Sequence, residues 1–240
     1  MHSGRRWLLS IVIASALGTL PTVALAWPTE IDGTAADFFD LGQPNDIARS
    51  VRVDPSGNVI AGGRLNNLGT GFDFTVIKFS GATGSELWRQ EINGSFGSFD
   101  DGRSVKVDPS GDVIAAGRLN NIGTGYDFTV IKFSGATGSE LWRQEINGTD
   151  GSFDKAVSVR VDASGDLIAG GVLVNSGTGD DFTVIKFSGA TGSELWRREI
   201  NGSDGGFDRG RSVTVDASGD VIAAGRLNNT ATGYAFTGIK

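Results

Sequence analysis

A stretch of 22 residues, DFTVIKFSGATGSELWRQEING at positions 73–94, decides the fold because the chain repeats it. The same letters return at 127–148 and, with Arg198 in place of glutamine, at 181–202, so the repeat period is 54 residues. A shorter motif, VDPSGNVIAGG in its first copy, shares this period and starts at Val53, Val107, Val161 and Val215. Self-similarity at this period is typical of repeat proteins, in which each unit buries its apolar faces by stacking on copies of itself.

Each unit contains four short runs with strand character. In the second unit they cover 103–107, 112–119, 128–133 and 140–146, which we name strands A, B, C and D. The link DPSG between A and B has the residue order of a type I turn, and the Gly-rich link between C and D has hairpin length. Strand C is apolar on both faces and strand D on one, as expected for an interior and an outer strand. The sequence therefore predicts an all-β fold, a β-propeller of four-stranded antiparallel blades built from four 54-residue repeats.

Two patterns carry a resemblance to known families. DFTVIKFSGATGSELW followed by SVRVDASGDLIAGG resembles the bacterial β-propeller repeat family often called seven-bladed propeller repeats, over the whole of residues 27–240. The part TGSELW is also similar to the T-G-x-x-x-W signature of quinoprotein dehydrogenase propellers, where that signature packs the blades. The resemblance implies that such an enzyme would be much longer, with eight blades, calcium ligands and often a vicinal cysteine pair. This chain has 240 residues and no cysteine.

The two ends of the chain differ from the repeats. Residues 1–26 are expected to be a secretory signal peptide, with a basic start, an apolar core and a small-residue cleavage site after Ala26. The propeller repeat domain then covers 27–240; it begins with a lone strand D at 27–33 and ends after a strand C. Two arrangements fit. The chain is either a closed, monomeric four-bladed propeller with 27–33 as the outer strand of the last blade, or a fragment of a larger propeller.

Composition limits the partners and the chemistry. Without residues 1–26 the chain carries 19 Lys and Arg against 28 Asp and Glu, a net charge of −9, which argues against nucleic acid as the partner. No apolar stretch reaches the roughly 20 residues that a membrane span needs. Cysteine is absent and the one histidine, His2, lies in the signal. Disulfides, thiol chemistry and the commonest general base are thus excluded, and we expect no cofactor.

Six arginines border the end of the blades where the B-to-C and D-to-A connections lie. Both connections are expected to be longer and more variable than the other two, as loops that carry function tend to be. The arginines begin strand A or end strand B, and the third unit has valine at both positions. The tentative ligand-binding set is Arg49, Arg64, Arg103, Arg118, Arg211 and Arg226.

Hairpin register predicts that the strand A arginine faces the strand B arginine of its own unit, as Arg49 would face Arg64. Two facing arginines repel each other unless an acid or a bound anion lies between them. One reading is therefore an anion site. The other is ion pairing with acids of the chain itself, for which the candidates are Asp46, Asp100, Asp208, Asp73 and Asp127.

Other candidate residues have simpler structural readings. Asp150, Asp154, Asp204 and Asp208 lie in Gly-rich loops and are calcium candidates, but no loop carries the ligand series of an EF-hand, which favours solvated loop acids. The repeated tryptophans of strand D could stack on sugars, although their fixed position favours packing between blades. They are Trp88, Trp142 and Trp196.

No catalytic constellation is present in the sequence. It predicts a secreted or periplasmic, non-enzymatic β-propeller that serves as a binding scaffold for a protein or a glycan. The alternative is a fragment of a quinoprotein-like, PQQ-type dehydrogenase propeller. Full-length sequence on either side of the repeats would discriminate between the two, because added blades or domains select different answers.

Overall fold

The computed structural model describes residues 31, 33, 46–97, 99–151 and 153–240, and every regular element in this part of the chain is a β-strand. No helix there is long and apolar enough to cross a membrane. The expected signal peptide at 1–26 lies outside the described residues. The strands are β1 (Ile47–Val53), β2 (Val59–Asn67), β3 (Gly71–Phe79), β4 (Glu86–Ile92), β5 (Asp101–Val107), β6 (Val113–Asn121), β7 (Gly125–Phe133), β8 (Glu140–Ile146), β9 (Lys155–Val161), β10 (Leu167–Asn175), β11 (Gly179–Phe187), β12 (Glu194–Ile200), β13 (Arg209–Val215), β14 (Val221–Asn229) and β15 (Gly233–Ile239).

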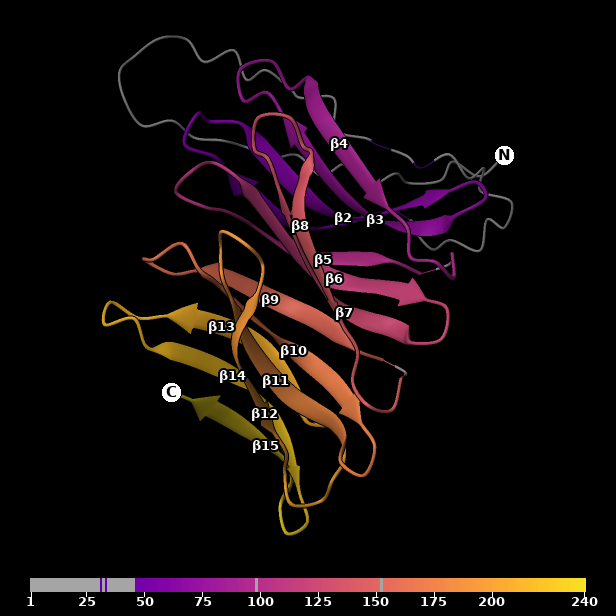
Figure 1. The fold of residues 1–240 in the computed structure, drawn as a ribbon, viewed down its shortest axis with the longest axis vertical. Helices are drawn as coiled ribbons and strands as arrows, with labels where there is room; N and C mark the ends of the chain where they lie inside the picture. The colour runs from indigo at the N-terminus through magenta and orange to yellow at the C-terminus, as the bar shows by residue number, and fades with distance from the viewer. Residues whose placement is uncertain (1–30, 32, 34–45, 98, 152) are drawn as a thin grey trace, which may run out of the picture.

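The strands form four antiparallel sheets that follow one another along the chain (Figure 1). β1–β4, β5–β8 and β9–β12 make four-stranded sheets, and β13–β15 make a sheet with three described strands. We name them blades 1 to 4. Within each blade every strand pairs with the next one in the chain, so the connections are hairpins, and the predicted propeller-type repeat is confirmed.

The connection between strands B and C is shorter than expected, because both strands are longer. Strand D of the second unit has its predicted bounds, because β8 covers Glu140–Ile146. Strands B and C are longer than predicted, and the last residue of β6, Asn121, pairs with the first of β7, Gly125. The B-to-C connection is thus a three-residue turn, and the expectation of a long loop was wrong. Gly123 and Gly125, with φ of +89° and +76°, supply the left-handed backbone that this turn requires.

Neighbouring blades pack through buried phenylalanine rings that lie over glycines. Phe74 of blade 1 is fully buried against Gly102 and Gly117 of blade 2, where an added Cβ would come within 3.2 and 2.6 Å of the ring. Phe182 of blade 3 meets the corresponding glycines of blade 4 in the same way. The repeat therefore places a large ring on one face of each sheet and a slot for it on the other.

The strand D tryptophans pack blade against blade, as predicted. The indole of Trp88 lies on Gly138 of the next blade, and its Nε1 donates to the carbonyl oxygen of Gly135 at 3.2 Å. Trp142 repeats both contacts one blade further on. A Cβ at Gly138 would lie 2.7 Å from the indole. The glycine of the T-G-x-x-x-W signature thus packs against the tryptophan of the preceding blade.

The first strand of each blade is the inner one, since β1, β5, β9 and β13 contact one another in turn. The row of blades is open, with blade 1 and blade 4 at opposite ends of the long axis (Figure 1). Phe236, the blade 4 counterpart of Phe74, is 90% exposed, and Val51, the blade 1 counterpart of buried Val105, is 44% exposed. The closed four-bladed arrangement is therefore not observed, whereas a run of blades from a larger propeller fits.

Ile31 and Gly33 are the described residues of the segment 27–33. The amide of Gly33 donates to Asp46 Oδ2 at 2.8 Å, as the amide of Gly94 after β4 donates to Asp100. Gly33 therefore lies beside blade 1, at the position that follows a strand D. The rest of the expected outer strand lies outside the described residues.

Candidate anion-binding site

At the end of the blades formed by the A-to-B and C-to-D connections, one set of lysines is already paired with aspartates. A lysine of each strand C binds the aspartate that opens the A-to-B turn of its own blade. The pairs are Lys78–Asp54, Lys132–Asp108, Lys186–Asp162 and Lys240–Asp216, at 2.7–3.0 Å. Two open hollows of about 380 and 340 Å³ lie at this end, and the lysines that line them, Lys78 and Lys132, belong to these pairs. These ion pairs therefore stabilise the turns at this end of the blades.

At the opposite end, the aspartate that closes each D-to-A connection binds backbone amides. Asp100 accepts from Gly94 N at 2.8 Å and from Asn120 N at 2.6 Å, which fastens the end of β4 to β6 of the next blade. Equivalent contacts are made by Asp46, Asp154 and Asp208. Asp73 and Asp127 accept from asparagine and threonine side chains. The acids expected to pair with the arginines were therefore wrong, although Arg49 and Arg103 do pair with another acid of the chain, Asp101.

The expected register of the arginines was also wrong. A β-bulge lies between Ala48 and Ser50, so Arg64 pairs with Ile47 and Arg49 has no cross-strand partner in the ladder. The same irregularity occurs in β5 and β13. A bulge re-aims the side chain of its extra residue. Here Arg49 reaches the neighbouring blade, where its Nε donates to Oδ1 of Asp101 at 2.8 Å.

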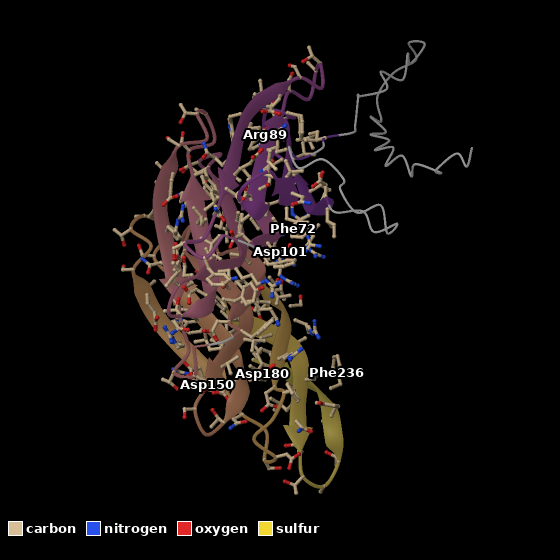
Figure 2. All side chains as sticks on the ribbon, turned by 90° about the vertical axis from the view of Figure 1, so that its right-hand side faces the viewer. Phe72, Arg89, Asp101, Asp150, Asp180 and Phe236 are labelled. Carbon is tan, nitrogen blue, oxygen red and sulfur yellow. The ribbon has the colours of Figure 1, made fainter. Side chains whose placement is uncertain are left out.

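Four of the six predicted arginines come together around Asp101, which is labelled in Figure 2. Arg103 Nη2 lies 3.0 Å from Asp101 Oδ2, and Arg118 is the cross-strand neighbour of Asp101 in the β5–β6 ladder. Burial lowers the pKa of Arg64, and the nearby charge of Asp101 acts in the opposite direction. Two guanidiniums, of Arg49 and Arg103, thus pair with one carboxylate, whose side chain is 1% exposed, and the guanidiniums of Arg64 and Arg118 form no ion pair among the described residues.

Two of these guanidiniums lie on aromatic rings. The Cζ atom of Arg64 is 4.3 Å from the ring centroid of Phe72, and that of Arg118 is 4.1 Å from Tyr126. Stacking of this kind fixes the plane of a guanidinium and leaves its N–H edge free to donate. The Nε atoms of Arg64, Arg103 and Arg118 are buried and have no hydrogen-bond acceptor in the described part of the chain. A buried donor without an acceptor costs about 1–3 kcal/mol, which an anionic oxygen would relieve.

The positive surface continues onto blades 3 and 4 with different residues. Lys155 begins β9, and burial together with the positive charges of Arg209, Arg103 and Arg118 lowers its pKa to about 8. Arg209 begins β13 and pairs with Asp180 at 2.6 Å. The first residues of the inner strands are Ile47, Asp101, Lys155 and Arg209, so this position varies among otherwise similar repeats. That variation was the signal that sequence reasoning missed.

The remaining predicted residues do not join the cluster. Arg226 lies 4.3 Å from the ring centroid of Tyr234 and donates to the carbonyl oxygen of Phe207, and Arg211 is exposed in β13. Of the calcium candidates, Asp154 and Asp208 use both carboxylate oxygens on backbone amides. Asp204 accepts from Asn228 and Asp150 is exposed. Among the described residues no group of three or more His, Cys, Asp or Glu could hold a metal.

Sequence reasoning also missed a second set of cations. Arg52, Lys106 and Arg160 are the penultimate residues of β1, β5 and β9. They share one repeat position near the A-to-B turns, and their periodicity is visible in the sequence as VRV, VKV and VRV. The inner strands therefore carry basic residues at both ends.

Comparison of the sequence with known protein families identifies the family of this chain. The sequence profile of the family described as outer membrane protein assembly factor BamB matches residues 72–235. The chain belongs to this family. No curated protein sequence is similar enough to match it. The seven-bladed type suggested by the resemblance stays a prediction.

Three solved structures are similar to the chain at low sequence identity. A quinohemoprotein alcohol dehydrogenase from Comamonas testosteroni has 15% identity and a TM-score of 0.52, over 76% of this chain and 29% of that one. BamB from Moraxella catarrhalis has 15% identity and a TM-score of 0.47, over 81% and 50%. A protein of unknown function from Bacteroides caccae has 12% and 0.48, over 82% and 62%. The chain thus spans 29–62% of the length of these proteins, and the likeness concerns fold alone.

Proposed function

We propose that this chain is part of a secreted or periplasmic, non-enzymatic β-propeller scaffold that binds an anionic group displayed by a protein or glycan partner. Membership in a family named for outer membrane protein assembly supports a periplasmic location and a partner, and the signal-like residues 1–26 agree with export. The arginine cluster at the junction of blades 1 and 2 is the binding site in this proposal. Carboxylate, sulfate and phosphate oxygens all fit guanidinium donors.

One observation carries the proposal: three buried arginine Nε atoms have no acceptor among the described residues, in a cluster of four arginines of which two pair with Asp101. Ion pairs built only for stability would place more carboxylates there, because burying unpaired charge is costly. The outer strands show that pattern, since Arg143 pairs with both Glu140 and Glu145. The excess of guanidiniums over carboxylates in the cluster supports the binding of a negative charge from outside.

The test replaces Arg103 and Arg118 by valine together, the residues that the third unit has as Val157 and Val172, while Arg49 stays as the ion-pair partner of Asp101 and keeps the fold intact. Galacturonate and N-acetylglutamate serve as sugar and protein carboxylate probes, titrated by NMR at low salt. The double variant is expected to lose about tenfold or more in affinity while it stays folded, with a lower melting temperature because Asp101 loses one of its two ion-pair partners. The control, Arg143→Val with Arg197→Val, removes the same charge from the outer strands and is expected to bind like the unmodified protein. Equal affinity for both double variants, or unfolding of the first, would contradict the proposal.

A further inference from the structure

The second set of cations forms a row across the inner strands of blades 1 to 3. Arg52, Lys106 and Arg160 occupy the same position on β1, β5 and β9, and these strands contact one another in turn. Burial lowers the pKa of Lys106 to about 8, and the positive charges of Arg160 and Arg52 add to this effect. The three side chains are therefore electrostatic neighbours. We call them the inner row.

The inner row has no carboxylate partner within the described residues. Each cation donates to the carbonyl oxygen of the residue before it, at 2.5, 3.3 and 2.9 Å in chain order. On the outer strands, Arg198 also donates to the carbonyl oxygen of the residue before it, whereas one arginine per strand, at a shared repeat position, pairs with two glutamates. These are Arg89, Arg143 and Arg197. Like charges on neighbouring strands repel, so an unneutralised row is favourable only if negative charge comes from outside.

The inner row and the arginine cluster lie on the same strands. Arg49 precedes Arg52 by three residues in β1, and Arg103 precedes Lys106 by three in β5. At a rise of about 3.3 Å per residue, the two positions are about 10 Å apart along the strand. One carboxylate or sulfate cannot meet both. The surface therefore suits a chain molecule that carries several anionic groups.

Exposed aromatic rings accompany the cations once per blade junction. Phe99, Phe153 and Phe207 occupy the same position of successive D-to-A connections and are 45%, 50% and 52% exposed. Lys155 Nζ lies 5.7 Å from the ring centroid of Phe153, and Arg209 Cζ lies 5.2 Å from that of Phe207. An apolar ring face beside a cation matches a sugar ring that bears an acid. Because the ring recurs at three junctions and has a cation beside it at two of them, the surface fits a polymer that repeats its charge, which a peptide of mixed sequence does not.

We propose that the inner row extends the arginine cluster into a binding surface for an acidic polysaccharide, a chain of sugars with carboxylate or sulfate groups. The inference rests on the proposed function and deepens it by naming the partner class. A nucleic acid fits less well, since its phosphates are packed at one charge per about 1.7 Å of duplex, whereas the arginine cluster and the inner row lie about 10 Å apart along the strand.

The test compares galacturonate with hexagalacturonate on three proteins. They are the unmodified chain, the inner-row variant Arg52→Gln/Lys106→Gln/Arg160→Gln, and a charge-matched control, Arg89→Gln/Arg143→Gln/Arg197→Gln. The unmodified chain and the control are expected to bind the hexamer at least about tenfold more tightly than the monomer. The inner-row variant should lose this gain but keep its affinity for the monomer. The slope of log affinity against log salt for the hexamer should fall by about 2–3 in that variant alone.

Distinct outcomes separate the two proposals. If galacturonate binds and Arg103→Val/Arg118→Val abolishes that binding, while the hexamer binds no more tightly than the monomer, the polysaccharide inference is wrong and the proposed function stands. If neither sugar binds, both are wrong for glycans. Tighter binding of hexaglutamate than of hexagalacturonate, lost in the inner-row variant, would overturn the polysaccharide in favour of an acidic peptide.

Discussion

The guanidinium of Arg118 lies 4.1 Å from the ring centroid of Tyr126, and its buried Nε has no acceptor among the described residues. Arg64 with Phe72 and Arg226 with Tyr234 repeat the stacking at 4.3 Å. The third unit has Val172 and Asp180 at the two positions, so arginine and ring are lost together. The aromatic residue is thus a support for the arginine, which in turn presents a free donor.

The blade junctions allow a matched stability test. Phe128→Ala removes a fully buried ring between blades 2 and 3 and is expected to lower the free energy of unfolding by about 3–5 kcal/mol. Phe236→Ala changes the same repeat position in blade 4, where the ring is 90% exposed, and should cost less than about 0.5 kcal/mol. Urea unfolding measures both. Similar losses would mean that Phe236 is covered in solution.

The contact between Trp88 and Gly138 can be tested with a second pair of variants. Gly138 and Gly111 both have positive φ, +74° and +86°, but Gly138 lies under Trp88 and nothing lies within 4 Å of a Cβ at Gly111. Gly111→Ala is expected to cost about 1 kcal/mol from backbone strain alone. Gly138→Ala adds a clash with the indole and should cost clearly more. Equal melting temperatures for the two variants would contradict the packing of Trp88 on Gly138.

Sequence periodicity was enough to predict the fold but not the site. Period and turn chemistry gave the meander of strands, and the position of Trp88 in strand D gave its packing role. The register of Arg49 could not be derived, because one extra residue in a bulge changes every cross-strand partner after it. Asp101 could not be recognised from recurring residues, because an acid occupies this position in one repeat alone. Contacts between blades, such as that of Arg49 with Asp101, depend on how sheets stack and are not encoded in the pattern of a single strand.

Two buried aspartates predict how stability depends on pH. Burial raises the pKa of Asp100 and Asp154 to about 6 in the folded protein, against 3.8 for an ordinary aspartate, although backbone hydrogen bonds act in the opposite direction. The folded state therefore binds more protons than the unfolded state between about pH 4 and 6. The contribution of these groups to stability is full below pH 4 and is lost as the pH rises through 6.

NMR titration of the two carboxyl carbons should give midpoints near pH 6. In addition, the stability difference between the unmodified protein and Asp100→Asn/Asp154→Asn should shrink from pH 4 to pH 7. Midpoints below pH 4 would show that the amide donors outweigh burial.

Lys155 predicts the pH dependence of binding. Since its pKa is lowered to about 8, it loses its charge between pH 7 and pH 9.5. Galacturonate affinity should fall several-fold over this range, and Lys155→Arg, which stays charged, should remove the dependence. If the affinity of Lys155→Arg for galacturonate still falls over this pH range, another group causes the pH dependence and the prediction for Lys155 is wrong.

The most direct test of the anion site observes the unpaired donors themselves. In the protein with ¹⁵N-labelled arginine, the Nε–H resonances of Arg64, Arg103 and Arg118 are followed during titration with galacturonate. The account predicts that these three signals shift together with one dissociation constant and that their hydrogen exchange slows, while the signals of Arg89, Arg143 and Arg197 stay in place. If the three signals do not move, or move no more than those of the outer arginines, the cluster does not bind an anion and the central claim is wrong.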